Sequence, residues 1–411
     1  MKTILATVLL LLPLSAAAES DSWPRFGGAT GDFKVSNAEL ATTWPKDGPP
    51  ELWRRPLGGG YGGIAVDGDV LYVLYLDGEN DVATALKTSD GTPLWKQSYP
   101  NKPREANQVQ FGRGPNTTPL VLADRLVTLG YNGELKSLSR DDGKVLWSHN
   151  LIPDFAGEVL KFGYSASPIE WKGNVIVAVG GEKHGIAAFD PKDGSVVWSG
   201  PPSSVTYATP IVANVDGENQ LLYFSADELI SLNADNGKEL WRYPIANQYK
   251  NHGSMPIWGD DNVLWLISQL EAPGRALRLS RGDDGKTQLE ELWKNDRLKI
   301  HFWNTIRVDN VVYGAIGGKV QFLAGIDIKN GEILWRERGY SQLNMVHTAN
   351  GTLGLDATGT LSLLDLSPKG MTVRAQAKLF EDQTWTAPTL VGDKLYIRDR
   401  ETIRAYDLAP K

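Results

Sequence analysis

The amino-acid sequence predicts an all-β fold, an eight-bladed β-propeller of four-stranded antiparallel blades. A short motif that ends in tryptophan recurs along the chain, and an Asp-Gly or Asn-Gly pair precedes most of its copies. The intervals between these tryptophans, counted from Trp53, are 42, 52, 51, 43, 52 and 42 residues. That spacing is typical of one propeller blade. No helical pattern of useful length follows residue 20, which favours strands throughout.

Each repeat divides into four short strands separated by turns. In the third copy, Asp193-Gly194 stands between the third and fourth expected strands and suits the positive φ values of a tight type I′ hairpin. The four strands of this copy are expected at residues 167–171, 175–179, 186–189 and 196–198. The copies end at Trp53, Trp95, Trp147, Trp198, Trp241, Trp293 and Trp335.

The two ends of the chain complete the ring. A further copy lacks the tryptophan but keeps Leu364-Asp365 and Lys369-Gly370 at the matching spacing. The last segment, residues 386–407, offers three strands, and residues 51–54 offer the missing outer strand. A blade formed from both ends leaves no open sheet edge. The sequence therefore predicts one propeller domain over residues 51–411, closed by its N-terminal strand.

A signal peptide is predicted at residues 1–18, followed by an N-terminal extension over residues 19–50. Lys2 precedes an apolar stretch of 11 residues, and Ala16-Ala17-Ala18 provides small residues for cleavage. The stretch is shorter than a membrane span, and no cysteine is present for a lipid anchor. We expect a monomeric protein that is periplasmic or extracellular and does not span a membrane.

Composition and weak motifs exclude several classes of protein. The absence of cysteine excludes a disulfide framework, an iron–sulfur site and a cysteine nucleophile. A formal net charge of −7 argues against nucleic acid as the partner. Residues 58–63 fit Gly-x-Gly-x-x-Gly but precede a strand instead of a helix, which argues against a dinucleotide site. The five histidines are scattered without metal-ligand spacing, and the acidic residues 77–81 are expected at a solvated hairpin tip.

The repeat resembles a known family. Residues 188–194, with Trp198 four residues on, are similar to the Ala-x-Asp-x-x-Thr-Gly-x-x-x-Trp motif of the quinoprotein-like (pyrroloquinoline quinone repeat, PQQ-like) eight-bladed propellers. The resemblance covers residues 50–411, and residues 22–28 look like the segment that often precedes such propellers. It implies either a periplasmic alcohol or sugar dehydrogenase that holds PQQ and Ca²⁺ over the central channel, or a cofactor-free scaffold. The propeller lipoprotein of the outer-membrane barrel-assembly machinery is of the second kind.

The alternation of strand direction assigns the loops to two faces of the ring. The mouth face carries the loops that precede each first strand and those between second and third strands; the turn face carries the Asp-Gly and Asn-Gly turns. Much of the extra length of the longer repeats falls in mouth-face loops 96–115 and 148–163, with Leu270 to Arg275 on the same face. Long loops gathered on one face are typical of a binding surface for a protein partner or a small ligand.

The residues just before each first strand are expected to ring the mouth of the channel. Their aromatic and amide groups would sandwich a planar ligand, with Arg113 pairing a carboxylate, or else they fill the narrow end of the channel. The candidate binding residues are Tyr61, Arg113, Asn116, Tyr164, Tyr207, His252, Trp303, Asn304, Asn344 and Trp385, with Ser165 and Asn251 beside them.

A quinone enzyme needs oxygen ligands for Ca²⁺ and a carboxylate base near the quinone. The ring offers Asn116, Asn304 and Asn344, and the nearest carboxylates in the sequence are Glu105 and Asp382. The adjacent-cysteine disulfide of many alcohol-oxidising members is absent, and the chain is shorter than such enzymes usually are. We therefore predict a binding or scaffold module without catalysis and without an assigned metal site. A dehydrogenase that uses PQQ and Ca²⁺ is the alternative.

Overall fold

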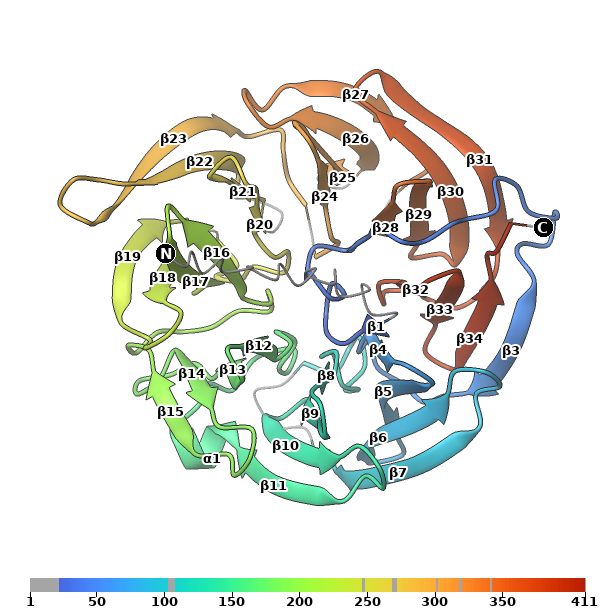
Figure 1. The fold of residues 1–411 in the computed structure, drawn as a ribbon, viewed down its shortest axis with the longest axis horizontal. Helices are drawn as coiled ribbons and strands as arrows, with labels where there is room; N and C mark the ends of the chain where they lie inside the picture. Colours follow the sequence, from blue (N-terminus) through green and yellow to red (C-terminus); the bar gives the residue numbers. More distant parts are fainter. Residues whose placement is uncertain are drawn as a thin grey trace, which may run out of the picture.

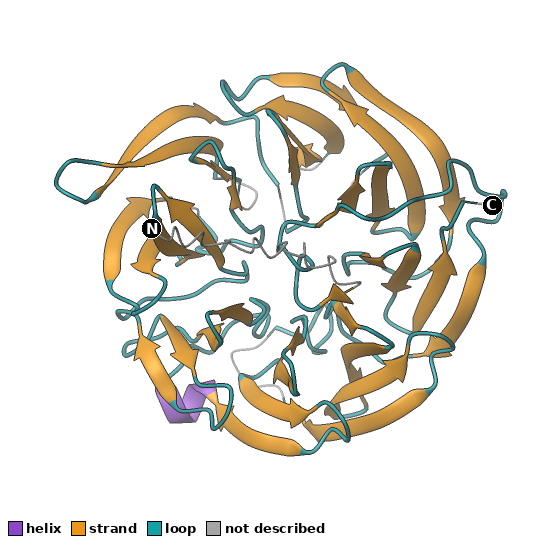
Figure 2. Ribbon diagram, in the orientation of Figure 1, coloured by secondary structure: helices purple, strands orange, loops and turns teal. Residues whose placement is uncertain are grey.

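Eight β-sheets surround a central axis and form the blades of a propeller (Figure 1). The computed structural model describes residues 22–102, 108–245, 248–267, 272–300, 302–317, 320–340 and 342–410. The predicted signal peptide lies outside these residues, as do Glu105 and His301. Within the described part of the chain the fold is all-β apart from one five-residue helix (Figure 2). The predicted fold class is confirmed.

Blades 1 to 4 follow one another along the chain, and the first of the four strands of each lies toward the axis. In blade 1 a two-residue strand of the N-terminal extension adds to this inner edge. Blade 1 contains β4 (Ile64–Asp67), β5 (Val70–Asp77), β6 (Asn80–Lys87) and β7 (Pro93–Pro100). Blade 2 contains β8 (Leu120–Val121), β9 (Arg125–Leu129), β10 (Glu134–Ser139) and β11 (Val145–Asn150), followed by helix α1 (Leu151–Phe155). Blade 3 contains β12 (Ile169–Trp171), β13 (Asn174–Ala178), β14 (Ile186–Phe189) and β15 (Val196–Ser199). Blade 4 contains β16 (Ile211–Val215), β17 (Glu218–Phe224), β18 (Glu228–Asn233) and β19 (Glu239–Pro244).

Blades 5 to 8 repeat this order of strands. Blade 5 contains β20 (Ile257–Trp258), β21 (Val263–Leu266), β22 (Gly274–Arg281) and β23 (Thr287–Asn295). Blade 6 contains β24 (Ile306–Val308), β25 (Val311–Gly317), β26 (Gln321–Asp327) and β27 (Ile333–Glu337). Blade 7 contains β28 (Leu343–Thr348), β29 (Gly351–Asp356), β30 (Thr360–Ser367) and β31 (Gly370–Lys378). Blade 8 contains β32 (Thr389–Val391), β33 (Lys394–Arg398), β34 (Thr402–Asp407) and, from the other end of the chain, β3 (Glu51–Pro56).

The pairing of β3 with β34 closes the ring. The two strands are antiparallel, with Trp53 opposite Ala405. Trp53 then reaches the next blade, because its indole Nε1 donates to the main-chain oxygen of Thr88 in blade 1 at 2.7 Å. The predicted closure by the N-terminal strand is therefore confirmed.

The repeat tryptophans dock on the glycines of the following blade. A Cβ atom added at Gly91 would lie 2.7 Å from the indole of Trp53, and one at Gly143 would lie 2.5 Å from the indole of Trp95. Gly194, Gly237 and Gly331 face Trp147, Trp198 and Trp293 in the same way. These glycines have φ values between +69° and +76°. The Asp/Asn-Gly pairs therefore serve both the tight turn and the close approach of the neighbouring indole.

The N-terminal extension lies on the turn face and ties four blades together. Strand β1 (Ser22–Trp23) pairs antiparallel with the end of β4, and β2 (Lys34–Val35) pairs parallel with β28 of blade 7. The oxygen of Pro24 accepts from Val121 of blade 2, and Ala41 donates to Leu408 after blade 8. Trp23, Phe33 and Leu40 are buried in an apolar cluster with blades 1, 7 and 8. The sequence predicted an extension here but not this role.

The Gly-x-Gly-x-x-Gly segment is a site of close packing between blades 8, 1 and 2. The guanidinium of Arg398 is fully buried and donates to the oxygens of Gly58 and Leu74 at 2.9 and 2.8 Å. A Cβ atom at Gly58 would lie 1.9 Å from the oxygen of Leu76, and one at Gly63 would lie 2.2 Å from the hydroxyl of Thr118. The glycines are thus required by the architecture of the ring seam.

Candidate functional site at the channel mouth

The loops converge near the axis of the propeller (Figure 2). Aromatic side chains from several loops of the mouth face are in contact there. The ring of Trp385 lies 4.9 Å from that of Tyr61 and 5.7 Å from that of Phe111, measured between centroids. The ring of Phe162 lies 5.8 Å from that of Phe111 and 6.0 Å from that of Tyr207. These contacts join the loops that precede blades 1, 2, 3, 4 and 8 into one aromatic layer.

The layer continues to the loop before blade 6. Phe302 packs edge-on against Trp385 at 5.3 Å, and Trp303 lies 6.0 Å from the same ring. The structure therefore brings together four of the predicted mouth residues, Tyr61, Tyr207, Trp303 and Trp385. Phe111, Phe162 and Phe302 also belong to this layer but are not among the mouth residues that the sequence predicts.

The three missed residues stand one or two positions before predicted ones. Phe111 precedes Arg113 and Phe162 precedes Tyr164, each by two residues. An aromatic residue shortly before a first strand is a signal that the sequence offered.

The predicted amides serve as links between blades. Asn304 donates to the oxygen of Met345 at 2.7 Å and accepts from the nitrogen of the same residue at 2.8 Å. Asn344 donates to the oxygen of Trp385 at 3.0 Å, and Asn116 donates to the oxygen of Phe162 at 3.0 Å. Their hydrogen-bonding groups are largely used in holding adjacent loops together.

Three other predicted mouth residues are also held by contacts within the fold. Arg113 donates to the oxygen of Gly78, at the turn between β5 and β6, at 3.0 Å. The hydroxyl of the buried Tyr164 donates to the oxygen of Val179 at 2.8 Å. The imidazole of His252 is fully buried and stacks on Phe224 with centroids 4.5 Å apart. Burial lowers the pKa of His252 to about 4, so this side chain is neutral at neutral pH.

Two carboxyl groups near the mouth are buried or half-buried, which the sequence does not predict. Glu158 is half-buried, accepts from the nitrogen of Val205 at 3.2 Å, and has a pKa raised by burial. Asp81 was expected at a solvated hairpin tip, but it is fully buried. It accepts from the side-chain nitrogen of Asn101 at 2.6 Å and from the main-chain nitrogen of Tyr131 at 3.3 Å. Burial raises the pKa of Asp81 to about 7.

The described part of the mouth offers few ligands for Ca²⁺ beside a quinone. No group of three or more His, Asp or Glu side chains within the described part of the chain could hold a metal ion. Asp382, the nearest predicted carboxylate that is described, accepts from the nitrogen of Gln383. Of the amides offered as oxygen ligands, Asn304 accepts through its side-chain oxygen from the nitrogen of Met345, and Asn344 accepts from the nitrogen of Asn304. What the mouth does present is aromatic surface.

The two long loops differ in detail from their predicted bounds. Residues 96–100 belong to β7, and residues 148–150 belong to β11. Helix α1 then occupies residues 151–155 of the second loop, with Asn150 as its N-cap. Val109 and Phe111 in the first loop are 47% and 46% exposed. The extra length therefore supplies strand extensions, a short helix and an exposed apolar segment.

The fold and the tryptophan docking define a quinoprotein-like propeller. A family model described as outer membrane protein assembly factor BamB matches residues 45–161 and 116–264, together more than half of the chain. The chain belongs to this family.

Curated relatives carry two kinds of name. The chain is 25% identical to an outer membrane protein assembly factor BamB from Yersinia pestis over 310 residues, which are 69% of this chain and 70% of the relative. It is 29% identical to the quinoprotein alcohol dehydrogenase PedH from Pseudomonas putida over 136 residues, which are 31% of this chain and 21% of that enzyme.

Solved structures of an assembly factor and of a dehydrogenase both share this fold. BamB from Moraxella catarrhalis superposes with a TM-score of 0.61 at 18% identity, over 87% of this chain and 97% of that one. A europium-containing methanol dehydrogenase superposes with a TM-score of 0.68 at 12% identity, over 92% of this chain and 89% of that one. At these identities the structures support the fold alone.

Proposed function

We propose that the protein is a non-catalytic scaffold of the cell envelope that binds a protein partner through its mouth face. The observation that carries the proposal is how the mouth uses its side chains. Amide and arginine groups bond to main-chain oxygens of neighbouring loops, whereas Val109 and Phe111 stay about half exposed. Exposed apolar groups beside a rigid aromatic layer suit a protein interface better than a polar substrate.

The relatives support the kind of partner. A relative aligned over most of this chain is named for outer membrane protein assembly. We infer that the partner is a soluble domain of a machine that assembles outer-membrane proteins. In this proposal the segment at residues 1–18 directs secretion to the periplasm, and the propeller acts there as a monomer.

Replacement of the exposed apolar pair tests this proposal. The double variant Val109→Ser/Phe111→Ser is expected to bind the purified periplasmic domains of the assembly machine of the same organism at least about tenfold more weakly. The matched control is Val197→Ser on β15, a residue that is 50% exposed at the rim of blade 3. Its affinity should stay within about twofold of the original in biolayer interferometry. Unchanged binding by the double variant, or no binding by the unmodified protein, contradicts the proposal.

A quinone-dependent dehydrogenase is the second candidate. The indole nitrogens of Trp303 and Trp385 are buried, and neither has a hydrogen-bond partner among the described residues. An aromatic mouth with two such donors suits a planar ligand that carries oxygen acceptors. Tight uptake of PQQ with Ca²⁺, together with dye-linked oxidation of an alcohol or sugar, would establish this function. The absence of any thermal shift with both additives would remove it.

A further inference from the structure

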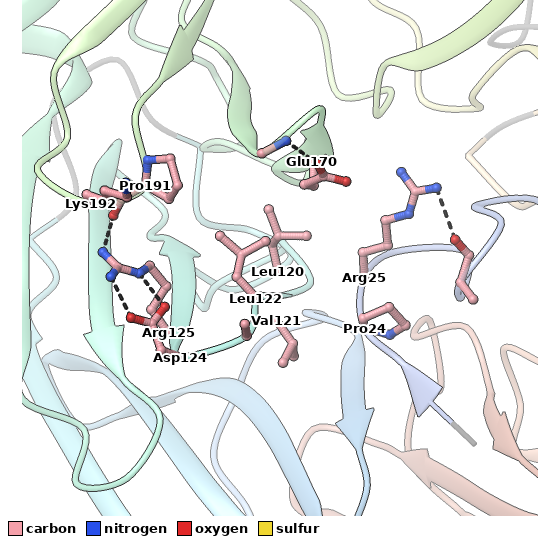
Figure 3. Close-up of a pocket in the computed structure, with 13 residues that line it drawn as sticks. Pro24, Arg25, Leu120, Val121, Leu122, Asp124, Arg125, Glu170, Pro191 and Lys192 are labelled. Atoms are coloured by element: carbon pink, nitrogen blue, oxygen red, sulfur yellow. Dashed lines mark hydrogen bonds and ion pairs between the residues drawn. The ribbon is translucent and has the colours of Figure 1, made fainter. Parts of the chain in front are cut away.

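A pocket of about 460 Å³ opens on the turn face, between the N-terminal segment and blades 2 and 3. This volume lies within the range of small-ligand sites. Figure 3 shows its walls: Pro24 and Arg25 on one side, Glu170 from blade 3 above, and Asp124, Arg125 and Lys192 on the far side. The pocket lies on the opposite face from the proposed partner surface.

The floor of the pocket is apolar. Leu120 and Val121 of β8 are buried, and Leu122 lies beside them at the start of the turn to β9. Pro24 and Pro191 add apolar surface on two sides. A ligand with an aliphatic side chain would bury it here.

The charges around the floor are of two kinds. Arg125 and Asp124 neutralise each other, with Nη2 and Oδ2 2.7 Å apart. Arg25 and Glu170 line the same pocket, and their opposite charges attract each other at longer range, without a direct ion pair among the described residues. Two opposite charges therefore face one cavity without direct contact.

Both groups keep hydrogen-bonding capacity. The Arg25 guanidinium, which has five N–H donors, makes one hydrogen bond within the described residues, to the oxygen of Ala29 at 3.2 Å. Glu170 accepts from the nitrogen of Gly173 through Oε1, and its Oε2 accepts no hydrogen bond from the residues that the structure describes. Burial lowers the pKa of Arg25, while the nearby carboxylates of Glu170 and Asp32 act in the opposite direction. A ligand carboxylate in hydrogen-bond contact would add a direct anionic partner to this half-covered guanidinium.

We propose that this pocket binds a short peptide with free termini. Arg25 pairs with the terminal carboxylate, Glu170 pairs with the terminal ammonium, and an aliphatic side chain lies on Leu120 and Leu122. A ligand with only one charge would meet the opposite residue unpaired, whereas a zwitterion satisfies both. A second pocket of about 240 Å³ shares Arg25 and Glu170, and it gives room for another side chain beside Met255.

Isothermal titration of the mature protein with the dipeptide Leu-Leu tests the proposal. Binding is expected with free Leu-Leu. Acetylation of its amino end and amidation of its carboxyl end are each expected to weaken binding about tenfold, because each removes one charged contact. Absence of binding by Leu-Leu at millimolar concentration overturns the proposal, as does equal binding by the doubly blocked peptide.

Two variants assign the ends of the peptide. Arg25→Gln is expected to bind Leu-Leu and its amide equally, while acetylation still weakens binding. Glu170→Gln is expected to bind Leu-Leu and its acetylated form equally, while amidation still weakens binding. Glu170 lies on β12 of blade 3, outside the N-terminal segment. The matched control is Lys192→Gln, which changes another charge of the same pocket. If both variants lose affinity for all four peptides alike, the pairing is wrong.

Discussion

Trp241 donates its indole N–H to the side-chain Oε1 of Gln220 in its own blade, at 2.8 Å. Five other repeat tryptophans donate instead to main-chain oxygens of the following blade. The difference arises in blade 5, which follows the blade of Trp241. There the Asp284-Gly285 turn stands farther along the chain from its own repeat tryptophan, Trp293, and the hairpin of β22 and β23 projects from the ring (Figure 1). Gly285 meets no indole there.

Gln220 is therefore expected to hold the junction of blades 4 and 5. Its Nε2 donates to the hydroxyl of Thr287 at 2.6 Å, while its Oε1 accepts from Trp241. Gln220→Leu leaves the indole N–H of the buried Trp241 and the hydroxyl of the half-buried Thr287 without this partner. It should lower the free energy of unfolding by about 2–4 kcal/mol in urea titrations. The control Gln288→Leu changes an exposed side chain of β23 in blade 5 and should cost less than about 1 kcal/mol. Equal losses would show that the junction does not depend on Gln220.

The docking of indoles on glycines predicts a difference between two Gly→Ala substitutions. Gly91 and Gly68 both have positive φ, +69° and +56°, so an alanine at either position is strained by about 1–2 kcal/mol. Only Gly91 faces an indole, that of Trp53, whereas an added Cβ at Gly68 meets open space. Gly91→Ala should therefore destabilise the protein by about 2 kcal/mol more than Gly68→Ala in thermal or urea unfolding. Similar values for both would contradict indole docking.

The buried carboxyl group of Asp81 predicts a pH dependence of stability. Burial raises the pKa of Asp81 from its ordinary 3.8 to about 7 in the folded protein. Between these values the folded state keeps a proton that the unfolded chain releases, so stability falls as pH rises from about 4 to about 7. The variant Asp81→Asn should lose this slope, and its stability relative to the original protein should increase over that interval.

The measurement for Asp81 has to be a difference between the two proteins. Burial lowers the pKa of His252 to about 4, so its contribution is lost as pH falls from about 6.5 to about 4, opposite in direction to that of Asp81. Urea titrations at pH 4.5, 6 and 8 on both proteins cancel the part due to His252. A constant difference across these pH values would show that Asp81 is ionised throughout.

The sequence was sufficient for the architecture because the docking residues repeat in register. Trp53 and its copies, with their glycines, define the blade length and the closure. The sequence also predicts which loops precede the first strands, and aromatic residues of those loops are in contact. It did not show which side chain of a loop points to the axis, because a shift of two residues decides between Phe111 and Arg113.

Other features could not be predicted from the sequence because they depend on contacts between distant parts of the chain. Asp81 sits in an acidic stretch typical of a solvated turn, yet Asn101 and Tyr131 cover it. The pocket at Arg25 forms because the N-terminal segment, residues 22–41, crosses the turn face. Its strand β1 has only two residues, too few to give a strand pattern in the sequence. Local patterns cannot report such pairings.

Two truncations separate the roles of the N-terminal segments. Removal of residues 19–41 takes away β1, β2 and the turn-face contacts but leaves β3 in blade 8. Removal of residues 19–56 also takes away β3 and exposes the edge of β34. The shorter deletion should lower the melting temperature and leave a monomer, whereas the longer one should aggregate through the open edge. Light scattering during heating and size-exclusion chromatography check both outcomes, and a stable monomer after the longer deletion would contradict closure by β3.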